Sequence, residues 1–164
     1  MEISRATSQD AAELTEIALA AKRHWGYPER WMELWRKDLT ITPQLADEGE
    51  VWVAEEGGTK LGFYALSPSG RELEHLWVRP ERLGEGVGRV LFLHALSRAA
   101  ELGAETVLIE SDPNAEGFYV RMGAAKIGER VSELDGRERV LPLLAARTRL
   151  TERPESGKPR PQQG

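Results

Sequence analysis

The sequence contains no cysteine among its 164 residues. This absence excludes disulfides, thiolate metal sites and cysteine nucleophiles together. No apolar run approaches the roughly 20 residues that a helix needs to cross a bilayer. The first ten residues, MEISRATSQD, lack the basic and apolar segments of a secretory signal. We therefore expect a cytoplasmic protein without a membrane partner.

Basic charge is also scarce, because 22 Lys and Arg stand against 27 Asp and Glu, which gives a net charge of −5. A nucleic-acid-binding domain would need a basic face, so we expect no nucleic-acid partner. No HExxH or other metal-ligand spacing is present, so we expect no metal. The remaining composition, 40% hydrophobic and 30% charged, is typical of a globular protein, and the length favours one domain.

Residues 1–146 are predicted to form this domain, and residues 147–164, polar and rich in proline, are predicted to be a disordered tail. Hydrophobic periodicity and turn residues predict the order β-α-α-β-β-β-α-β-α-β-β, which indicates a mixed sheet covered by helices on both faces. The predicted strands are 3–6, 51–55, 61–66, 72–78, 106–110, 125–130 and 140–144. The predicted helices are 7–24, 28–39, 87–102 and 115–122.

Residues 83–89, LGEGVGR, place three glycines at alternate positions between a predicted strand and a predicted helix. Glycines at this density let a ligand approach the main chain, and a helix N-terminus favours an anion such as pyrophosphate. A P-loop would need Lys and Ser or Thr after the last glycine, but Arg89 and Val90 follow Gly88. A dinucleotide-binding turn would need its third glycine one residue later. A plain strand-to-helix turn without a ligand is the remaining alternative.

This stretch resembles the acetyl-CoA loop of the GNAT N-acetyltransferase superfamily, which has the pattern VxPxxxGxGxG. The matching residues are Val78, Pro80, Gly84, Gly86 and Gly88. The downstream stretch DPNAEGFYVRMGA, residues 112–124, resembles the second signature of the family, a strand end followed by a short helix with a tyrosine. The resemblance covers residues 2–145. It implies an α/β (α+β) fold, with a mixed, mostly antiparallel central sheet of about seven strands, splayed in the middle, and helices on both faces.

By this resemblance, the chain is an enzyme that moves an acetyl group from acetyl-CoA directly to a primary amine of a small molecule or a peptide. The resemblance implies that Tyr119 is the general acid for the departing thiolate. It also implies that a backbone N–H near Leu76–Val78, at a strand bulge, stabilises the oxyanion. The predicted cofactor-binding residues are Leu76, Trp77, Val78, Leu83, Gly84, Glu85, Gly86, Val87, Gly88, Arg89 and Asn114.

Two positions depart from the family pattern. Leu83 stands where the family usually has Arg or Gln, which shifts the expected pyrophosphate contacts to the backbone, with Arg82 or Arg89 as the source of charge. Asp112, and not asparagine, stands seven residues before Tyr119. We therefore assign the contact with the pantetheine arm of acetyl-CoA to Asn114.

The general base is expected on the strand 72–78, because a charged side chain in a buried strand needs a partner or a role. Strand alternation places Glu72, Glu74, Leu76 and Val78 on one face and Leu73, His75 and Trp77 on the other. Glu74 is the first candidate for the base, followed by His75 and Glu72, and then by Glu110. The alternative is an ion pair of Glu74 with Arg71, Arg79 or Arg82.

The acceptor side is predicted at the break between the first two helices. The resemblance implies that this segment walls the acceptor site, and His24, Trp25 and Tyr27 supply aromatic surface with polar tips there. The alternative is that the same side chains only pack a helix end. For the whole chain, a non-catalytic module that binds acyl-CoA as a sensor is the alternative function, and a nucleotide-dependent enzyme is a third. A homodimer, as in many relatives, is an open alternative to a monomer.

Overall fold

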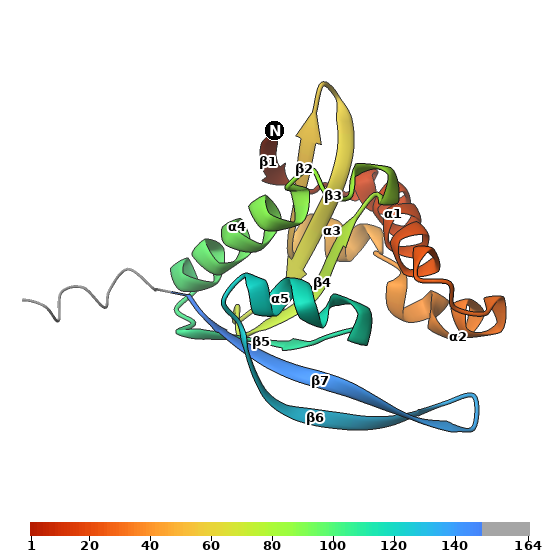
Figure 1. Cartoon of the computed structure of the whole chain (residues 1–164). Coiled ribbons are helices and arrows are strands. Elements are labelled where there is room, and N and C mark those ends of the chain that lie inside the picture. Colours follow the sequence, from red (N-terminus) through yellow and green to blue (C-terminus); the bar gives the residue numbers. More distant parts are fainter. Residues whose placement is uncertain (149–164) are drawn as a thin grey trace, which may run out of the picture.

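Seven strands form one sheet in the order β1-β2-β3-β4-β5-β7-β6 (Figure 1). The computed structural model describes residues 1–148. The strands are β1 (Glu2–Arg5), β2 (Glu50–Glu56), β3 (Thr59–Leu66), β4 (Glu72–Val78), β5 (Thr106–Glu110), β6 (Ala125–Leu134) and β7 (Arg137–Arg147). All neighbouring strands pair antiparallel except β4 and β5, which are parallel. The predicted mixed, mostly antiparallel sheet is confirmed.

The helices lie on both faces of this sheet (Figure 1). They are α1 (Ala11–His24), α2 (Glu29–Leu39), α3 (Pro43–Glu48), α4 (Val87–Glu101) and α5 (Glu116–Arg121), with short 3-10 helices η1 (Ser8–Asp10), η2 (Pro80–Arg82) and η3 (Pro113–Ala115). The sequence prediction missed α3. Its signals are local: Thr42 Oγ1 accepts a hydrogen bond from the Leu45 N–H, and Pro43 occupies the first helical position.

The last two strands are longer than predicted. They form a hairpin that turns at Asp135 and Gly136, both with positive φ, of 54° and 78°. This backbone suits the right-handed twist of the strands, so pairing continues up to the turn. At the other end, β7 reaches Arg147, one residue beyond the predicted domain boundary. The predicted disordered tail from 149 onward lies outside the described residues.

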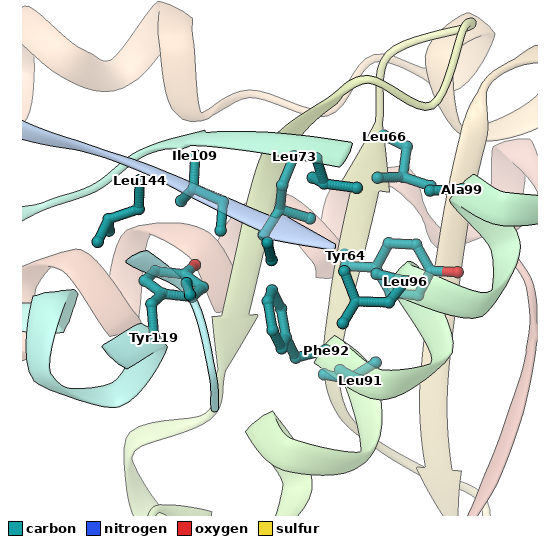
Figure 2. Close-up of a cluster of buried hydrophobic side chains, with 14 of the residues drawn as sticks. Tyr64, Leu66, Leu73, Leu91, Phe92, Leu96, Ala99, Ile109, Tyr119 and Leu144 are labelled. Atoms are coloured by element: carbon teal, nitrogen blue, oxygen red, sulfur yellow. The ribbon is translucent and has the colours of Figure 1, made fainter. Parts of the chain in front are cut away.

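Two hydrophobic clusters flank the sheet. One, called the α4–α5 cluster below, contains the buried faces of α4 and α5 with side chains of β3, β4, β5 and β7 (Figure 2). The other contains the buried faces of α1, α2 and α3 against β2 and β3. Tyr119 of α5 belongs to the first cluster, where its ring lies 5.5 Å from that of Phe92 and 5.2 Å from that of Phe118. The clusters hold α1 and α5 on opposite sides of the sheet near its centre.

The sheet is splayed between β4 and β5. These strands pair at only two positions, Glu72 with Leu108 and Leu73 with Ile109. Beyond these two positions, β4 pairs only with β3 and β5 pairs only with β7. The second half of β4 therefore has no partner strand on the side of β5. The opening gives access to main-chain groups in the middle of the sheet.

A bulge in β4 corrects the predicted faces of this strand. Leu73 pairs with Leu66 and His75 pairs with Ala65, so Glu74 is an extra residue. A bulge reverses the alternation of side chains. Leu73 therefore lies in the α4–α5 cluster, as Leu76 does. The prediction that Glu74 shares a face with Leu76 and Val78 was wrong, and so was the bulge position near Leu76–Val78.

Glu50, at the start of β2, joins three elements through one largely buried carboxylate. It accepts two hydrogen bonds of 2.8 Å from Arg98 of α4, one of 3.1 Å from Arg5 of β1, and one of 3.1 Å from the Trp52 indole. These contacts, led by Arg98, lower the pKa of Glu50 to about 2. The ionised Glu50 therefore stabilises the folded state above pH 4.5, and this stabilisation is lost as the carboxylate is protonated between pH 4.5 and 2.

We therefore predict that Glu50→Gln lowers the free energy of unfolding at pH 7 by about 2–3 kcal/mol, because it removes the buried charge that pairs with Arg98 and Arg5 and leaves Arg98 only its ion pair with Glu101. It should also weaken the pH dependence of stability between pH 4.5 and 2. Urea unfolding across this pH range measures both effects. Glu48→Gln, at an exposed site on α3, is the matched control and should change stability by less than about 0.5 kcal/mol. Equal stability of the two variants would contradict the prediction.

Candidate active site

The glycine loop presents a row of free backbone donors. Gly84 and Gly86 have φ of +83° and +89°, a conformation that favours glycine. Within the described residues, the amides of residues 84–89 have no backbone acceptor, and the first paired amide is that of Val90, which donates to the Gly86 carbonyl at 3.1 Å. No atom lies within 4 Å of a Cβ built on Gly84 or Gly86. The loop therefore fits an anion bound by main-chain N–H groups at the N-terminus of α4.

A cleft of about 470 Å³ opens beside this loop and is called the loop cleft below. The glycine loop, the end of β4, α5 and the end of α1 form its walls. The predicted cofactor residues that line it are Leu76, Trp77, Val78, Leu83, Gly84, Gly86, Val87, Gly88, Arg89 and Asn114. Glu85 does not line it, and its carboxylate instead pairs with Arg82 at 2.8 Å.

Arg82 and Arg89 are the two candidate cations for a bound pyrophosphate, and of these Arg82 already forms ion pairs whereas Arg89 does not. Arg82 pairs with Glu85 and also with Glu56, at 2.9 Å. The exposed Arg89 guanidinium forms no ion pair among the described residues, and its hydrogen bond is to Met122 Sδ, at 3.9 Å. Leu83, at the rim of the cleft, is 47% exposed. A phosphate in this cleft would therefore meet Arg89 and the backbone amides.

Gly88 lets α4 and α5 pack closely. A Cβ built there would lie 3.3 Å from Cε1 of Phe118, tighter than an ordinary contact. This packing places Phe118 and Tyr119 at the wall of the loop cleft. The third glycine of the motif therefore lies at a tight contact between α4 and α5, the helix that carries Tyr119.

The free edge of β4 turns two residues toward the opening in the sheet. The Arg79 N–H donates to the Leu61 carbonyl of β3. Main-chain groups alternate along an antiparallel pair, so those of Leu76 and Val78 point away from β3 and toward the opening. Both residues line the loop cleft. Their N–H groups are suitably placed to bind a carbonyl oxygen.

A small cavity of about 70 Å³, here called the junction cavity, lies between the diverging strands. Tyr119 lines both this cavity and the loop cleft. The Tyr119 side chain is buried and its hydroxyl forms no hydrogen bond to another described residue. Burial, and then the charge of Asp112, raises its pKa well above the usual 10. The phenol therefore stays protonated at any working pH.

Glu74, His75 and Glu110 line the junction cavity, whereas Glu72 does not. Glu74 forms no ion pair with any described residue, so the alternative of an arginine partner is not realised. Partial burial, and then the charge of Glu72, raises the pKa of Glu74 above its ordinary value of 4.5. Burial lowers the pKa of His75 to about 4, and its Nδ1 accepts a hydrogen bond from the Trp77 indole. Glu110 pairs with Arg130 at 2.7 Å.

The three predicted acceptor residues separate into two groups. His24 and Trp25 line the loop cleft, on the side of the glycine loop. Tyr27 instead contacts the segment between β5 and η3, because its hydroxyl lies 3.0 Å from the Asp112 carboxylate. It also accepts hydrogen bonds from Asn114 Nδ2 and Arg139, at 3.0 and 2.8 Å. The segment 24–27 therefore borders both the loop cleft and the opposite face of the sheet.

A buried polar network on that opposite face was missed by the sequence prediction. Lys22 of α1 pairs with Asp112 at 2.6 Å, and its ammonium lies 4.2 Å from the Trp35 ring centroid. Burial alone would raise the pKa of Asp112, but the contact with Lys22 holds it below the ordinary value. Lys22 follows Ala18 by four residues on the buried stripe of α1, and a charge on such a stripe was the available signal.

The network borders a pocket of about 210 Å³ beside α2, called the α2 pocket. Glu74, His75 and Glu110 line both the α2 pocket and the junction cavity. The loop cleft and the α2 pocket therefore approach the same point of the sheet from opposite faces. Among the described residues, no group of three His, Asp or Glu could hold a metal, and no helix is long and apolar enough to cross a membrane.

The sequence model of the acetyltransferase (GNAT) family matches residues 11–124, more than half of the chain. The chain belongs to the GNAT acetyltransferase family. This confirms the resemblance and the predicted enzyme class. Peptidyl-lysine N-acetyltransferase YjaB of Salmonella typhimurium is 35% identical over 133 residues, which cover 71% of this chain and 88% of that protein. YjaB of Escherichia coli K12 is 41% identical over 98 residues, which cover 59% of this chain and 63% of that protein, less than two thirds.

Solved structures share the fold. A GCN5-related N-acetyltransferase from Rhodopseudomonas palustris superposes with a TM-score of 0.77 at 20% identity, over 89% of this chain and 94% of that one. A GNAT acetyltransferase from Brucella melitensis, in complex with acetyl-CoA, superposes with a TM-score of 0.58 at 25% identity, over 99% of this chain and 92% of that one.

Proposed function

We propose that this chain transfers the acetyl group of acetyl-CoA to the side-chain amine of a lysine in a peptide or protein. The observation that carries the proposal is the junction cavity between β4 and β5, which is lined both by Tyr119 of the loop cleft and by Glu74 of the α2 pocket. The acceptor class is supported by the two YjaB relatives, which are named peptidyl-lysine N-acetyltransferases.

Acetyl-CoA, when bound, supplies the activated acetyl group. In this proposal the free amides of residues 84–89 and the Arg89 guanidinium hold the pyrophosphate, and Asn114 contacts the pantetheine arm. The N–H groups of Leu76 and Val78 hold the carbonyl oxygen of the thioester, on which negative charge develops during the attack. The acetyl-CoA bound in the Brucella melitensis relative supports this use of the fold.

Glu74 acts as the base. A lysine ammonium has a pKa of about 10.4, so it must lose a proton before its nitrogen can attack. Glu74 takes that proton, directly or through a water molecule. The amine nitrogen then forms a bond to the acetyl carbon, the carbon–sulfur bond breaks, and the Tyr119 hydroxyl donates its proton to the departing sulfur. The nitrogen loses its second proton as the amide forms, and this proton restores the Tyr119 hydroxyl through solvent. The products are an acetyl-lysine and free CoA.

We expect Glu74→Gln to lower kcat about 100-fold, because the amide cannot accept the proton. In the parent enzyme the rate should fall as the pH drops below the pKa of Glu74, which is raised above 4.5. This fall of the rate at low pH should be absent in Glu74→Gln. In Glu72→Gln it should occur at lower pH, because removal of the neighbouring negative charge lowers the pKa of Glu74. Steady-state rates between pH 4.5 and 9 measure these effects. An unchanged rate and profile in Glu74→Gln would exclude it as the base.

The acceptor class is tested by CoA release against a panel of amines, with acetyl-CoA binding measured by calorimetry in parallel. The panel contains lysine peptides, peptides with only an α-amine, and small primary amines. The proposal predicts the highest kcat/KM for lysine peptides. Preference for an α-amine or a small amine would overturn the acceptor class. Tight acetyl-CoA binding without turnover of any amine would instead show a non-catalytic acyl-CoA-binding module.

A further inference from the structure

We infer that the lysine acceptor is presented by an extended peptide with basic residues beside the lysine, and that these bind a groove on the face of the sheet next to the α2 pocket. The inference rests on the proposed function, because it names the substrate class of the same site. The groove has a volume of about 870 Å³ and is called the acidic groove. The residues that line it come from β4, β5, β7 and β6, whereas α1, α2 and α3 pack against β2 and β3.

The acidic groove is continuous with the proposed site of transfer. Glu74 and Glu110 line the acidic groove, the α2 pocket and the junction cavity. A peptide lying in the groove can therefore place one lysine side chain at the opening between β4 and β5, while its neighbouring residues remain over β5, β7 and β6. A free small amine would not use this length of surface.

Four carboxylates line the groove, namely Glu72, Glu74, Glu110 and Glu129. Glu110 pairs with Arg130, which also lines the groove, and Glu129 pairs with Lys126 at 3.0 Å. Glu72 and Glu74 have no ion-pair partner among the described residues, and their mutual repulsion contributes to the raised pKa of Glu74. A cationic ligand would relieve this repulsion, whereas an acidic or neutral one would not. The charge of the groove is thus complementary to a basic peptide.

The floor of the groove is apolar. Leu108 and Val131 are 37% and 59% exposed, and Leu143 lies beside them. Long basic side chains bury their methylene stems on such a surface while their charged heads reach carboxylates. The chain itself provides an example, because Arg130 lines this groove and its guanidinium pairs with Glu110 at 2.7 Å. Glu72 offers the same arrangement to an arginine or lysine of the peptide.

The test compares three peptides of equal length in which the single lysine is flanked on both sides by arginine, alanine or aspartate. We expect kcat/KM for the arginine peptide to exceed that for the alanine peptide about 3- to 10-fold at low salt, with the aspartate peptide slowest. The preference should shrink in 0.5 M NaCl, because these carboxylates are exposed to solvent. Glu72→Gln and Glu129→Gln should each reduce the ratio of the arginine to the alanine peptide.

Glu16→Gln, an equal change of charge at an exposed site on α1 outside the groove, should leave both the ratio and the rate with the alanine peptide unchanged. Equal kcat/KM for all three peptides would overturn this inference and leave the proposed function standing. Turnover of a small polyamine in place of every peptide would overturn both, and so would the absence of any turnover.

Discussion

Gly86→Val should abolish measurable binding of acetyl-CoA. Gly86 has a φ of +89°, which a β-branched residue adopts only with severe strain, so valine forces the loop into another conformation. The amides of residues 84–89 are then displaced, and the anion loses donors in this loop. We expect an increase in Kd of at least about 100-fold, corresponding to 2.7 kcal/mol or more. Isothermal titration calorimetry with acetyl-CoA measures it.

Two controls separate this effect from unfolding and from lost side-chain contacts. Gly128→Val places the same side chain in β6, where φ is not positive and no atom lies within 4 Å of the added Cβ, and it should bind normally. Leu83→Arg, in the same loop, should bind acetyl-CoA equally well or better, because the binding groups are backbone amides and the new cation lies at the rim of the cleft. Normal binding by a folded Gly86→Val protein would show that the loop is only a strand-to-helix turn.

Tyr119→Phe should lower kcat about 100-fold while KM for acetyl-CoA stays within a factor of about three. The substitution removes only the hydroxyl and preserves the ring contacts with Phe92 and Phe118. The hydroxyl has no hydrogen-bond partner among the described residues, so its loss leaves no other group unsatisfied. Stability should therefore change by less than about 0.5 kcal/mol. Steady-state kinetics and thermal unfolding of the variant provide both readings.

Tyr64→Phe is the matched control for Tyr119→Phe. Tyr64 is also a buried tyrosine of the α4–α5 cluster (Figure 2). Its hydroxyl, however, lies 2.7 Å from Nδ1 of His94, and Tyr64 does not line the loop cleft. Loss of the Tyr64 hydroxyl should lower the free energy of unfolding by about 1 kcal/mol and leave kcat unchanged. Equal kcat in the parent and in Tyr119→Phe would exclude Tyr119 as the acid.

Much of the fold could be predicted because the local signals agree with the tertiary structure. The hydrophobic stripe of α1, the glycines that begin and follow α4, and the apolar run of β5 each indicate one element at one place. The short helix α3 was missed because six residues carry too little periodicity. The hairpin of β6 and β7 was shortened because β6 lies at an edge of the sheet and is mostly exposed, so it has no strong apolar alternation.

The site was predicted where it depends on the backbone and missed where it depends on distant contacts. The positive φ of Gly84 and Gly86 follows from the loop itself. The face of Glu74 could not be predicted, since it depends on a bulge set by the register of β4 against β3. Similarly, Lys22 and Asp112 are 90 residues apart, and only the tertiary fold brings α1 and the segment after β5 together.

The central claim is that donor and acceptor meet at the opening between β4 and β5. A crystal structure of the chain with a bisubstrate analogue, CoA joined through its sulfur to the amine of a lysine peptide, tests it most directly. We expect the pyrophosphate on the amides of residues 84–89, the sulfur near the Tyr119 hydroxyl, and the lysine nitrogen within reach of Glu74, directly or through one water. A pyrophosphate bound away from this loop, or a lysine that approaches from the side of α4, would contradict the account.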